Sequence, residues 1–448
     1  MDLHTTPADQ TADASTTRAR SRIFPWVVFA LTFGLLLSDY MSRQVLPAVF
    51  PYLKTQWGLS DSRLGALTSV VALMVALGTV PLSLLADRWG RVRSLLIMAT
   101  FWSVATLLCA CAGTFGQMLG ARFLLGVGEA AYGSVGAAVV VSVFSPRLRA
   151  SVSGAFLAGG SFGSVLGIAL GGVIARHIGW RATFVAMAVF GLLLVAAFRL
   201  LVTEHRLQRH HITDDTTPQH DPATGVRAPL SSLFSTVSVW CVYLAGGLQL
   251  FVSAVLMAWL PSFFNRCYGM APDRAGLTAA AYALLIGIGM IGCGLIADRV
   301  AHAEPARLWS IVAVYCVLSL VVLMVAFSLP TGPAQLTALG IGALFCAGST
   351  GAISSLVINL THPSLRATAF GTAVLFNNIF GLAAGPLVVG FLADHYGLPT
   401  ALRLVPPAYL GVLAIVIVGR RAHPADLHGP VRSQTGSASA RPAQPADS

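Results

Sequence analysis

Long apolar runs, twelve in number, dominate this 448-residue chain. Each run has about twenty residues or more, the length that an α-helix needs to cross the hydrocarbon core of a membrane. Only 10% of the residues are charged and 56% are hydrophobic, so a water-soluble fold would expose large apolar patches. The sequence therefore predicts an all-α membrane protein with twelve transmembrane helices. We place the spans at residues 24–47, 62–86, 94–113, 117–143, 150–175, 180–202, 236–264, 274–297, 308–329, 333–359, 367–393 and 399–419.

Short sequences recur between the two halves of the chain. Leu85-Ala86-Asp87-Arg88 closes one apolar run, and Ile296-Ala297-Asp298-Arg299 closes another 211 positions later. A longer echo, at an offset of 218, matches Phe162, Gly163, Gly167, Gly172, Ala175, His177 and Gly179 with Phe380, Gly381, Gly385, Gly390, Ala393, His395 and Gly397. Such internal repeats are typical of secondary transporters. We expect two pseudo-symmetric six-helix bundles, at residues 23–203 and 236–420.

The remaining segments are polar and should be disordered. They are an amino-terminal tail at residues 1–22, a linker at 204–235 and a carboxy-terminal tail at 421–448. If both tails and the linker are cytoplasmic, the inner side holds 18 of the 28 Lys and Arg residues and the outer side holds 7. This bias predicts a multi-pass protein of an inner (cytoplasmic) or plasma membrane with both termini in the cytoplasm.

The net charge of +11 is then mostly a topology signal. The basic residues are spread over many short loops, so we expect no nucleic-acid binding. The expected partners are membrane lipid and a small-molecule substrate, and we expect a monomer. The cysteines show no metal-ligand spacing, and we expect no metal site and no cofactor. Metal binding by the linker is the alternative to a solvated segment, because the linker carries His210, His211, Asp214, Asp215, His220 and Asp221.

Ionisable residues inside the spans are the strongest functional signal. Of 17 acidic residues, only Asp39 and Glu129 lie well inside a span, together with Arg43 and Arg122. A charge at the centre of a membrane helix costs about 3 kcal/mol on insertion scales, so such residues are functional candidates. Asp39 and Arg43 share one face of their helix, as do Arg122 and Glu129. We expect Asp39 and Glu129 to carry protons, and Arg43 and Arg122 to bind an anion.

A static charge cluster that only holds spans one and four together is the alternative interpretation. The spans of the second half contain no acidic residue well inside the membrane and offer neutral polar groups instead. We expect Gln249, Asn377 and Asn378, together with Tyr40 of the first half, to contact the substrate. Hydrogen bonding between helices, without ligand contact, is the competing interpretation of the two asparagines.

The loop between spans two and three carries the motif that indicates a family. Its sequence is Ser83-Leu84-Leu85-Ala86-Asp87-Arg88-Trp89-Gly90-Arg91-Val92-Arg93. It resembles the Gly-x-x-x-Asp-Arg-x-Gly-Arg-x-Arg motif of the major facilitator superfamily, whose fold has two six-helix bundles around a central cavity. The resemblance implies that spans one and four both line this cavity, and we therefore expect Asp39 to pair with Arg122. We interpret Asp87, Arg88, Gly90 and Arg91, with Asp298 and Arg299 of the second copy, as a cytoplasmic latch. A purely topological role for the arginines is the alternative.

Three further segments resemble the spinster-like and anion:cation symporter branches of that superfamily. They are Asp39-Tyr40-Met41-Ser42-Arg43-Gln44-Val45-Leu46-Pro47, the stretch from Arg122 to Ala130, and Gly179-Trp180-Arg181. The relatives have Asn-Tyr-x-Asp-Arg in span one, so here the acid has moved from the position of Ser42 to that of Asp39.

The resemblance implies a secondary active transporter that moves a small organic anion, such as a sugar acid, an aromatic acid or a similar carboxylate, by alternating access. The driving ion would be the proton. Export of an amphiphile, such as a lysolipid or a hydrophobic drug, is the alternative, and a permease-like receptor is a remote one. The sequence shows no set of catalytic residues, so we expect no enzyme.

Overall fold

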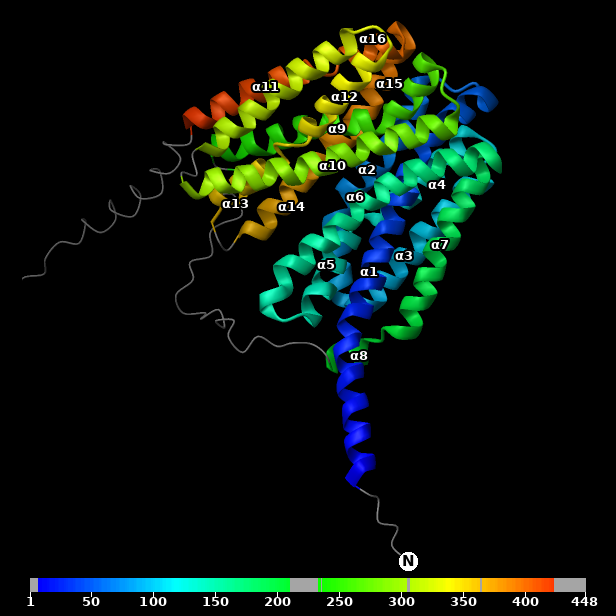
Figure 1. Cartoon of the computed structure of the whole chain (residues 1–448), viewed down its shortest axis with the longest axis vertical. Coiled ribbons are helices and arrows are strands. Elements are labelled where there is room, and N and C mark those ends of the chain that lie inside the picture. Colours follow the sequence, from blue (N-terminus) through cyan, green and yellow to red (C-terminus); the bar gives the residue numbers. More distant parts are fainter. Residues whose placement is uncertain (1–6, 210–232, 235, 304–306, 363–364, 423–448) are drawn as a thin grey trace, which may run out of the picture. The chain divides into compact units, whose positions relative to one another are not determined.

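The computed structural model of the chain is almost entirely helical (Figure 1). It describes residues 7–209, 233–234, 236–303, 307–362 and 365–422. Within these residues, twelve helical segments are long and apolar enough to cross a membrane. The predicted all-α class and the twelve spans are therefore confirmed. The segments are Ile23–Trp57, Asp61–Ala86, Arg91–Cys111, Phe115–Val143, Ser151–His177, Trp180–Leu201, Val237–Tyr268, Pro272–Val300, Arg307–Ser328, Pro333–Leu360, Thr368–Tyr396 and Leu398–Ala422.

Several spans contain more than one helical element. The elements are α1 (Pro7–Trp57), α2 (Asp61–Trp89), α3 (Arg91–Cys111), α4 (Phe115–Glu129), α5 (Tyr132–Val143), α6 (Pro146–His177), α7 (Trp180–Leu201), α8 (Glu204–Arg209), α9 (Val237–Tyr268), α10 (Pro272–Ala303), α11 (Arg307–Ser328), α12 (Pro333–Cys346), α13 (Thr350–Leu360), α14 (Arg366–Phe376), the π-helix η3 (Asn377–Ala383), α15 (Ala384–Tyr396) and α16 (Leu398–Arg403). A last helical stretch covers residues 408–422.

Contacts divide the chain into two compact units. The first unit comprises Met1–Gly225, Ala254–Gly287 and Leu382–Leu402, and the second comprises Val226–Ser253, Ile288–Gly381 and Arg403–Ser448. The boundaries predicted at residues 203 and 236 follow the sequence repeat and stay a prediction. Residues 7–22, assigned above to the amino-terminal tail, continue α1 as helix. Residues 1–6, most of the linker (210–232) and residues 423–448 lie outside the described residues.

Breaks interrupt the fourth and the tenth span at corresponding positions of the repeat. α4 ends at Glu129 and α5 begins at Tyr132, while α12 ends at Cys346 and α13 begins at Thr350. The hydroxyl of Thr79 donates to the carbonyl of Ala130 at 2.8 Å, which satisfies one backbone group that the first break frees. In transporters, paired interrupted helices indicate the region of the binding site.

Several of the repeated glycines lie at close helix crossings. A Cβ atom added at Gly163 would lie 2.5 Å from the carbonyl oxygen of Leu37 on α1 in the first unit. In the second unit, a Cβ at Gly381 would lie 2.9 Å from the carbonyl oxygen of Gly247 on α9. Because only glycine allows backbones to approach this closely, the echo in the sequence reflects equivalent crossings.

Another pair of repeated glycines joins distant segments within the first unit. Gly172 of α6 lies against the start of α10, where an added Cβ would be 2.7 Å from the carbonyl oxygen of Pro272. Gly390 of α15 lies against the start of α2, where an added Cβ would collide with the carbonyl oxygen of Asp61. Both crossings join a helix end of one half to a helix start of the other.

Alanine at these two crossings should destabilise the protein. We expect Gly172→Ala and Gly390→Ala each to cost about 1–3 kcal/mol, because the methyl group forces packed backbones apart. Gly154 of α6 is the matched control, since nothing lies within 4 Å of its added Cβ. Gly154→Ala should be neutral or stabilise by up to about 1 kcal/mol through helix propensity. Thermal unfolding of the purified proteins measures the difference, and equal effects at all three positions would contradict it.

Candidate functional site

The first unit buries the predicted membrane charges in one cluster. Nε of Arg43 lies 3.8 Å from Oε2 of Glu129, and the two side chains are 13% and 2% exposed. Asp39 is buried and interacts electrostatically with Glu129 and with Arg43. Tyr40 is partly buried on the same helix, and its ring contacts the position of Gly160. The structure therefore brings together span one and the end of α4 through opposite charges.

Several polar atoms of this cluster receive no hydrogen bond from a donor group within the described residues, although the carboxyl groups of Asp39 and Glu129 can share one hydrogen bond when either of them is protonated. The atoms are Oδ1 of Asp39, Nη2 of Arg43 and both carboxylate oxygens of Glu129. Buried groups of this kind are costly unless they are satisfied, and unsatisfied ones in a native fold require an explanation. Reversible binding of a proton, or of an anion beside Arg43, would supply the missing partners.

Arg122 makes a different set of contacts from those expected. It is 0% exposed. Its Nε donates to the carbonyl of Leu67 at 3.3 Å, its Nη1 to that of Ser42 at 3.0 Å and its Nη2 to that of Arg43 at 2.9 Å. The prediction that Asp39 pairs with Arg122 is therefore wrong. Backbone carbonyls accept the hydrogen bonds of the Arg122 guanidinium, and the ion pair of the cluster joins Arg43 to Glu129.

The second unit has a small cavity of about 40 Å³ with a partly polar lining. Its polar lining comes from Gln249 of α9, Thr350 and Ser354 of α13, and Asn377 of η3. Asn377 faces α9, because its Oδ1 would lie 2.9 Å from a Cβ added at Gly246. Asn378 is buried and donates to the carbonyl of Val374 at 2.9 Å. The two asparagines therefore differ: the first lines the cavity and the second bonds to its own helix.

The break in the tenth span shapes this cavity. Nε2 of Gln249 donates to the carbonyl of Cys346 at 2.7 Å, and the hydroxyl of Tyr409 donates to the same carbonyl at 2.9 Å. The hydroxyl of Thr350 in turn donates to Oε1 of Gln249 at 3.3 Å. Gln249 thus connects the last carbonyl of α12 to the first turn of α13, and its amide is fixed in orientation.

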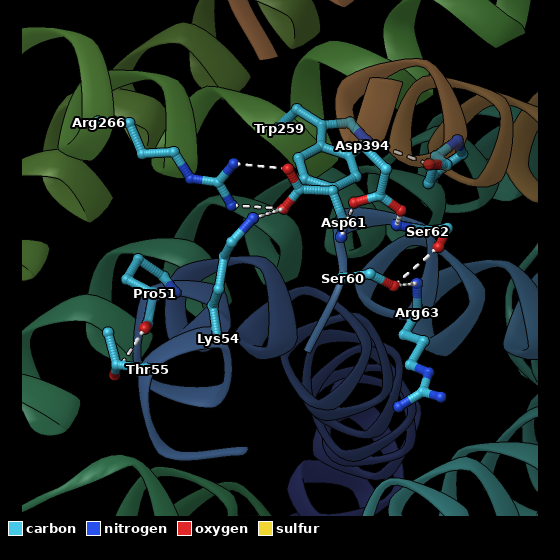
Figure 2. Close-up of polar contacts among 11 residues, drawn as sticks. Pro51, Lys54, Thr55, Ser60, Asp61, Ser62, Arg63, Trp259, Arg266 and Asp394 are labelled. Atoms are coloured by element: carbon cyan, nitrogen blue, oxygen red, sulfur yellow. Dashed lines mark hydrogen bonds and ion pairs between the residues drawn. The ribbon is translucent and has the colours of Figure 1, made fainter. Parts of the chain in front are cut away.

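A network of charges at the start of α2 was not predicted. We call Lys54, Asp61, Arg266 and Asp394, all in the first unit, the Asp61 network. Figure 2 shows the side chains of Lys54 and Arg266 converging on the carboxylate of Asp61. Arg266 donates through Nη1 and Nη2 at 2.8 and 2.7 Å, and Nζ of Lys54 donates at 2.7 Å. This is a bidentate ion pair, the strongest arrangement that Arg and Asp form.

Asp394 completes the Asp61 network through the backbone. Its Oδ1 accepts the N–H of Asp61 at 2.6 Å and its Oδ2 accepts the N–H of Ser62 at 2.9 Å (Figure 2). The end of α15 therefore caps the N-terminus of α2, where carboxylates are favoured. The pattern Ser60-Asp61 indicates a helix start, but no signal in the sequence links position 61 to residues 205 and 333 positions away.

The loop motif lies where α2 gives way to α3. Gly90 separates the two helices with a φ of +87°, a conformation that favours glycine. Oε2 of Glu204 accepts the N–H of Val92 at 3.2 Å, a contact that the sequence did not predict. Arg88 and Arg91 are exposed, as are Asp298 and Arg299 of the second copy, and the side chain of Asp87 lies outside what the structure describes. A latch at this loop stays a prediction.

Comparison with known proteins agrees with this architecture. Residues 32–384 match the family model of the Major Facilitator Superfamily. A probable L-galactonate transporter of Escherichia coli (strain K12) is 25% identical over 81% of this chain and 82% of its own, and a gallate transporter of Pseudomonas putida is 26% identical over 90% and 94%.

A bacterial homolog of the human lysosomal transporter Spinster, solved in an inward-facing and unoccupied conformation, has a similar fold. Its TM-score is 0.80 at 18% identity, over 90% of this chain and 98% of that chain. The predicted fold and the predicted resemblance are thereby confirmed. With twelve apolar helices, a repeated glycine framework and a family match over most of its length, the chain is a transporter rather than an enzyme, and it belongs to the Major Facilitator Superfamily.

Proposed function

We propose that this protein couples the movement of protons to that of a small organic anion by alternating access. The observation that carries the proposal is the buried pair of Arg43 and Glu129. The carboxylate oxygens of Glu129 receive no hydrogen bond from a donor group within the described residues and lie beside the carboxyl group of Asp39, with which they can share a proton. A proton can neutralise the carboxylate of Glu129, which is the partner of Arg43. Arg43 can therefore bind an anion when Glu129 is protonated.

The sign of the coupling follows from charge balance. When Glu129 binds a proton, Arg43 loses its ion pair with Glu129, and its positive charge is then less compensated and attracts a carboxylate. When Glu129 releases the proton, the ion pair re-forms and the negative charges of Glu129 and Asp39 repel the anion. Proton and anion therefore bind together, and the apparent affinity for the anion should increase as the pH falls. This differential binding supplies the bias that two alternating states require.

The cavity of the second unit offers neutral polar groups, whereas the first unit carries the charged ones. Amide and hydroxyl groups of Asn377, Thr350 and Ser354 can donate to or accept from the hydroxyls of a sugar acid or an aromatic acid. The galactonate and gallate transporters to which the chain is similar support this substrate class. The distribution of Lys and Arg supports an inner or plasma membrane location with both termini cytoplasmic. We expect the protein to act as a monomer.

Uptake into proteoliposomes tests the proposal. The purified protein is exposed to sugar acids, aromatic acids, dicarboxylates and lysolipids, with the lumen at higher pH than the outside or at equal pH. We expect one carboxylate class to accumulate only with the inward proton gradient. Movement of lysolipid alone would overturn anion symport in favour of amphiphile export. Stabilisation of the purified protein by a carboxylate without any transport would overturn it in favour of a receptor.

The two neighbouring asparagines should respond differently to substitution. Asn377→Ala removes an amide from the cavity lining. We expect the KM for the transported acid to rise about fivefold or more, because the substrate loses one or more hydrogen bonds to this amide. Asn378→Ala is the matched control and should mainly lower the unfolding temperature, because its amide bonds to the carbonyl of Val374. Initial uptake rates and thermal unfolding separate the two effects. A higher KM for Asn378→Ala alone would contradict the assignment.

A further inference from the structure

The backbone of span one contains a carbonyl that its own helix does not satisfy. In an α-helix the carbonyl of residue 43 accepts from the N–H of residue 47. Residue 47 is Pro47, inside α1, and proline has no N–H. The carbonyl of Arg43 is therefore left without its helical donor, in a region where an unsatisfied backbone group is costly.

Arg122 supplies that donor from another helix. Its Nη2 donates to the carbonyl of Arg43 at 2.9 Å, the shortest of its three hydrogen bonds. Nη1 and Nε reach the carbonyls of Ser42 and Leu67, so one buried guanidinium joins α1, α2 and α4. The donors of a guanidinium stand in a rigid planar fork, so this contact fixes the position of the Arg43 backbone relative to α4.

Helix α4 also contacts the side chain of Arg43. Glu129 lies seven residues after Arg122 on α4, or about 10 Å along the helix axis, and faces the guanidinium of Arg43. Arg122 contacts the backbone of Arg43 and Glu129 contacts its side chain. A change in the first contact therefore alters the geometry of the second.

We propose that Arg122 is a positioning residue: it replaces the missing N–H of Pro47 and thereby holds Arg43 in register with Glu129, without contacting the transported anion. This rests on the proposed function, in which Arg43 and Glu129 form the coupling site. It gives Arg122 a role different from the anion binding expected from sequence.

A double-mutant cycle between positions 47 and 122 tests the proposal. Pro47→Ala gives residue 47 an N–H, so the carbonyl of Arg43 no longer depends on Arg122. We expect Arg122→Lys in the native background to lower kcat about tenfold or more, with KM within about twofold, because a lysine cannot make all three contacts. In the Pro47→Ala background, the further loss on Arg122→Lys should shrink to about threefold or less.

Pro51 provides the matched control, because it lies in the same helix but its substitution gives the carbonyl of Arg43 no donor. Arg122→Lys in the Pro51→Ala background should still lower kcat about as strongly as in the native background. Equal losses in all three backgrounds would overturn the proposal. So would a KM that rises about tenfold on Arg122→Lys while kcat is unchanged, because that pattern indicates loss of uniform substrate binding.

Thermal unfolding of the same six proteins, native and Arg122→Lys in each background, provides a readout that needs no substrate. We expect the fall in unfolding temperature caused by Arg122→Lys to be smaller with Pro47→Ala than with Pro51→Ala. If Arg122→Lys does not fold, recovery of folded protein by Pro47→Ala but not by Pro51→Ala supports the proposal, and recovery by neither overturns it. Coupling in unfolding together with absent carboxylate transport would refute the proposed function but leave the hydrogen-bond assignment standing.

Discussion

Glu129→Gln should abolish pH-driven accumulation of the substrate while substrate exchange continues. Glutamine keeps the size of the side chain but cannot bind or release a proton, so the ion pair of Arg43 with position 129 is absent at every pH. We expect the accumulation ratio in proteoliposomes to fall to about one, because a carrier with no differential response to the proton cannot use its gradient. Affinity for the anion should become nearly independent of pH.

Glu129→Asp is the control for this prediction, since it shortens the side chain but keeps a carboxyl group. It should retain accumulation above equilibrium, at a lower rate. Counterflow, in which external labelled substrate exchanges for internal unlabelled substrate, verifies that the glutamine variant is folded and active. Full pH-driven accumulation by Glu129→Gln would show that the coupling proton binds elsewhere.

Asp61→Asn should weaken the Asp61 network more than any other single substitution in it. The carboxylate is the shared acceptor of Arg266 and Lys54. An asparagine removes this shared counterion and leaves Asp394, which interacts electrostatically with Lys54, as the negative charge of the network. Breaking a fully buried ion pair costs about 3–5 kcal/mol. We expect Asp61→Asn to lower the free energy of unfolding by about 2–3 kcal/mol. This is less than for a fully buried pair, because the side chain of Arg266 is 25% exposed and water partly screens its charge. Thermal unfolding of the purified protein measures the loss.

Two comparisons make this prediction specific. Asp61→Asn with Arg266→Gln should be more stable than Asp61→Asn alone, since the double variant removes a charge that the single variant leaves unpaired. Asp273→Asn makes the same change in the first turn of α10, and Oδ1 of Asp273 is buried without a hydrogen-bond partner among the described residues. It should cost less than Asp61→Asn. An equal cost at both positions would indicate a general effect of losing negative charge.

Local sequence signals predicted the spans but not their interruptions. Apolar runs of spanning length leave little choice other than helices in a membrane, and the twelve spans followed. The break after Glu129 falls on Ala130 and Ala131, residues with the highest helix propensity. Its stabilising contact comes from Thr79, 51 positions earlier, so a local pattern does not reveal it.

The candidate site was predictable in its residues and not in its pairing. The cost of membrane charges singled out Asp39, Arg43, Arg122 and Glu129. Which arginine would pair with an acid depended on the backbone. The carbonyl of Arg43, which lacks a donor because residue 47 is proline, accepts from the guanidinium of Arg122, and the guanidinium of Arg43 is left to pair with Glu129. That signal was present in the sequence as Pro47. The contact of Asp61 with Asp394, by contrast, joins residues 333 positions apart, and no local rule predicts it.

The crossings at Gly172 and Gly390 have a consequence for how a duplicated gene diverges. At each crossing the neighbouring backbone excludes even a methyl group, so neither copy can exchange its glycine without moving a helix. Side chains around the crossings are under no such limit: position 176 is Arg, and its counterpart 394 is Asp. The two halves of the chain can therefore acquire different polar side chains, acidic in one half and amide in the other, while both keep the same glycines at their helix crossings. Specialisation of the two halves requires no change in their shared architecture.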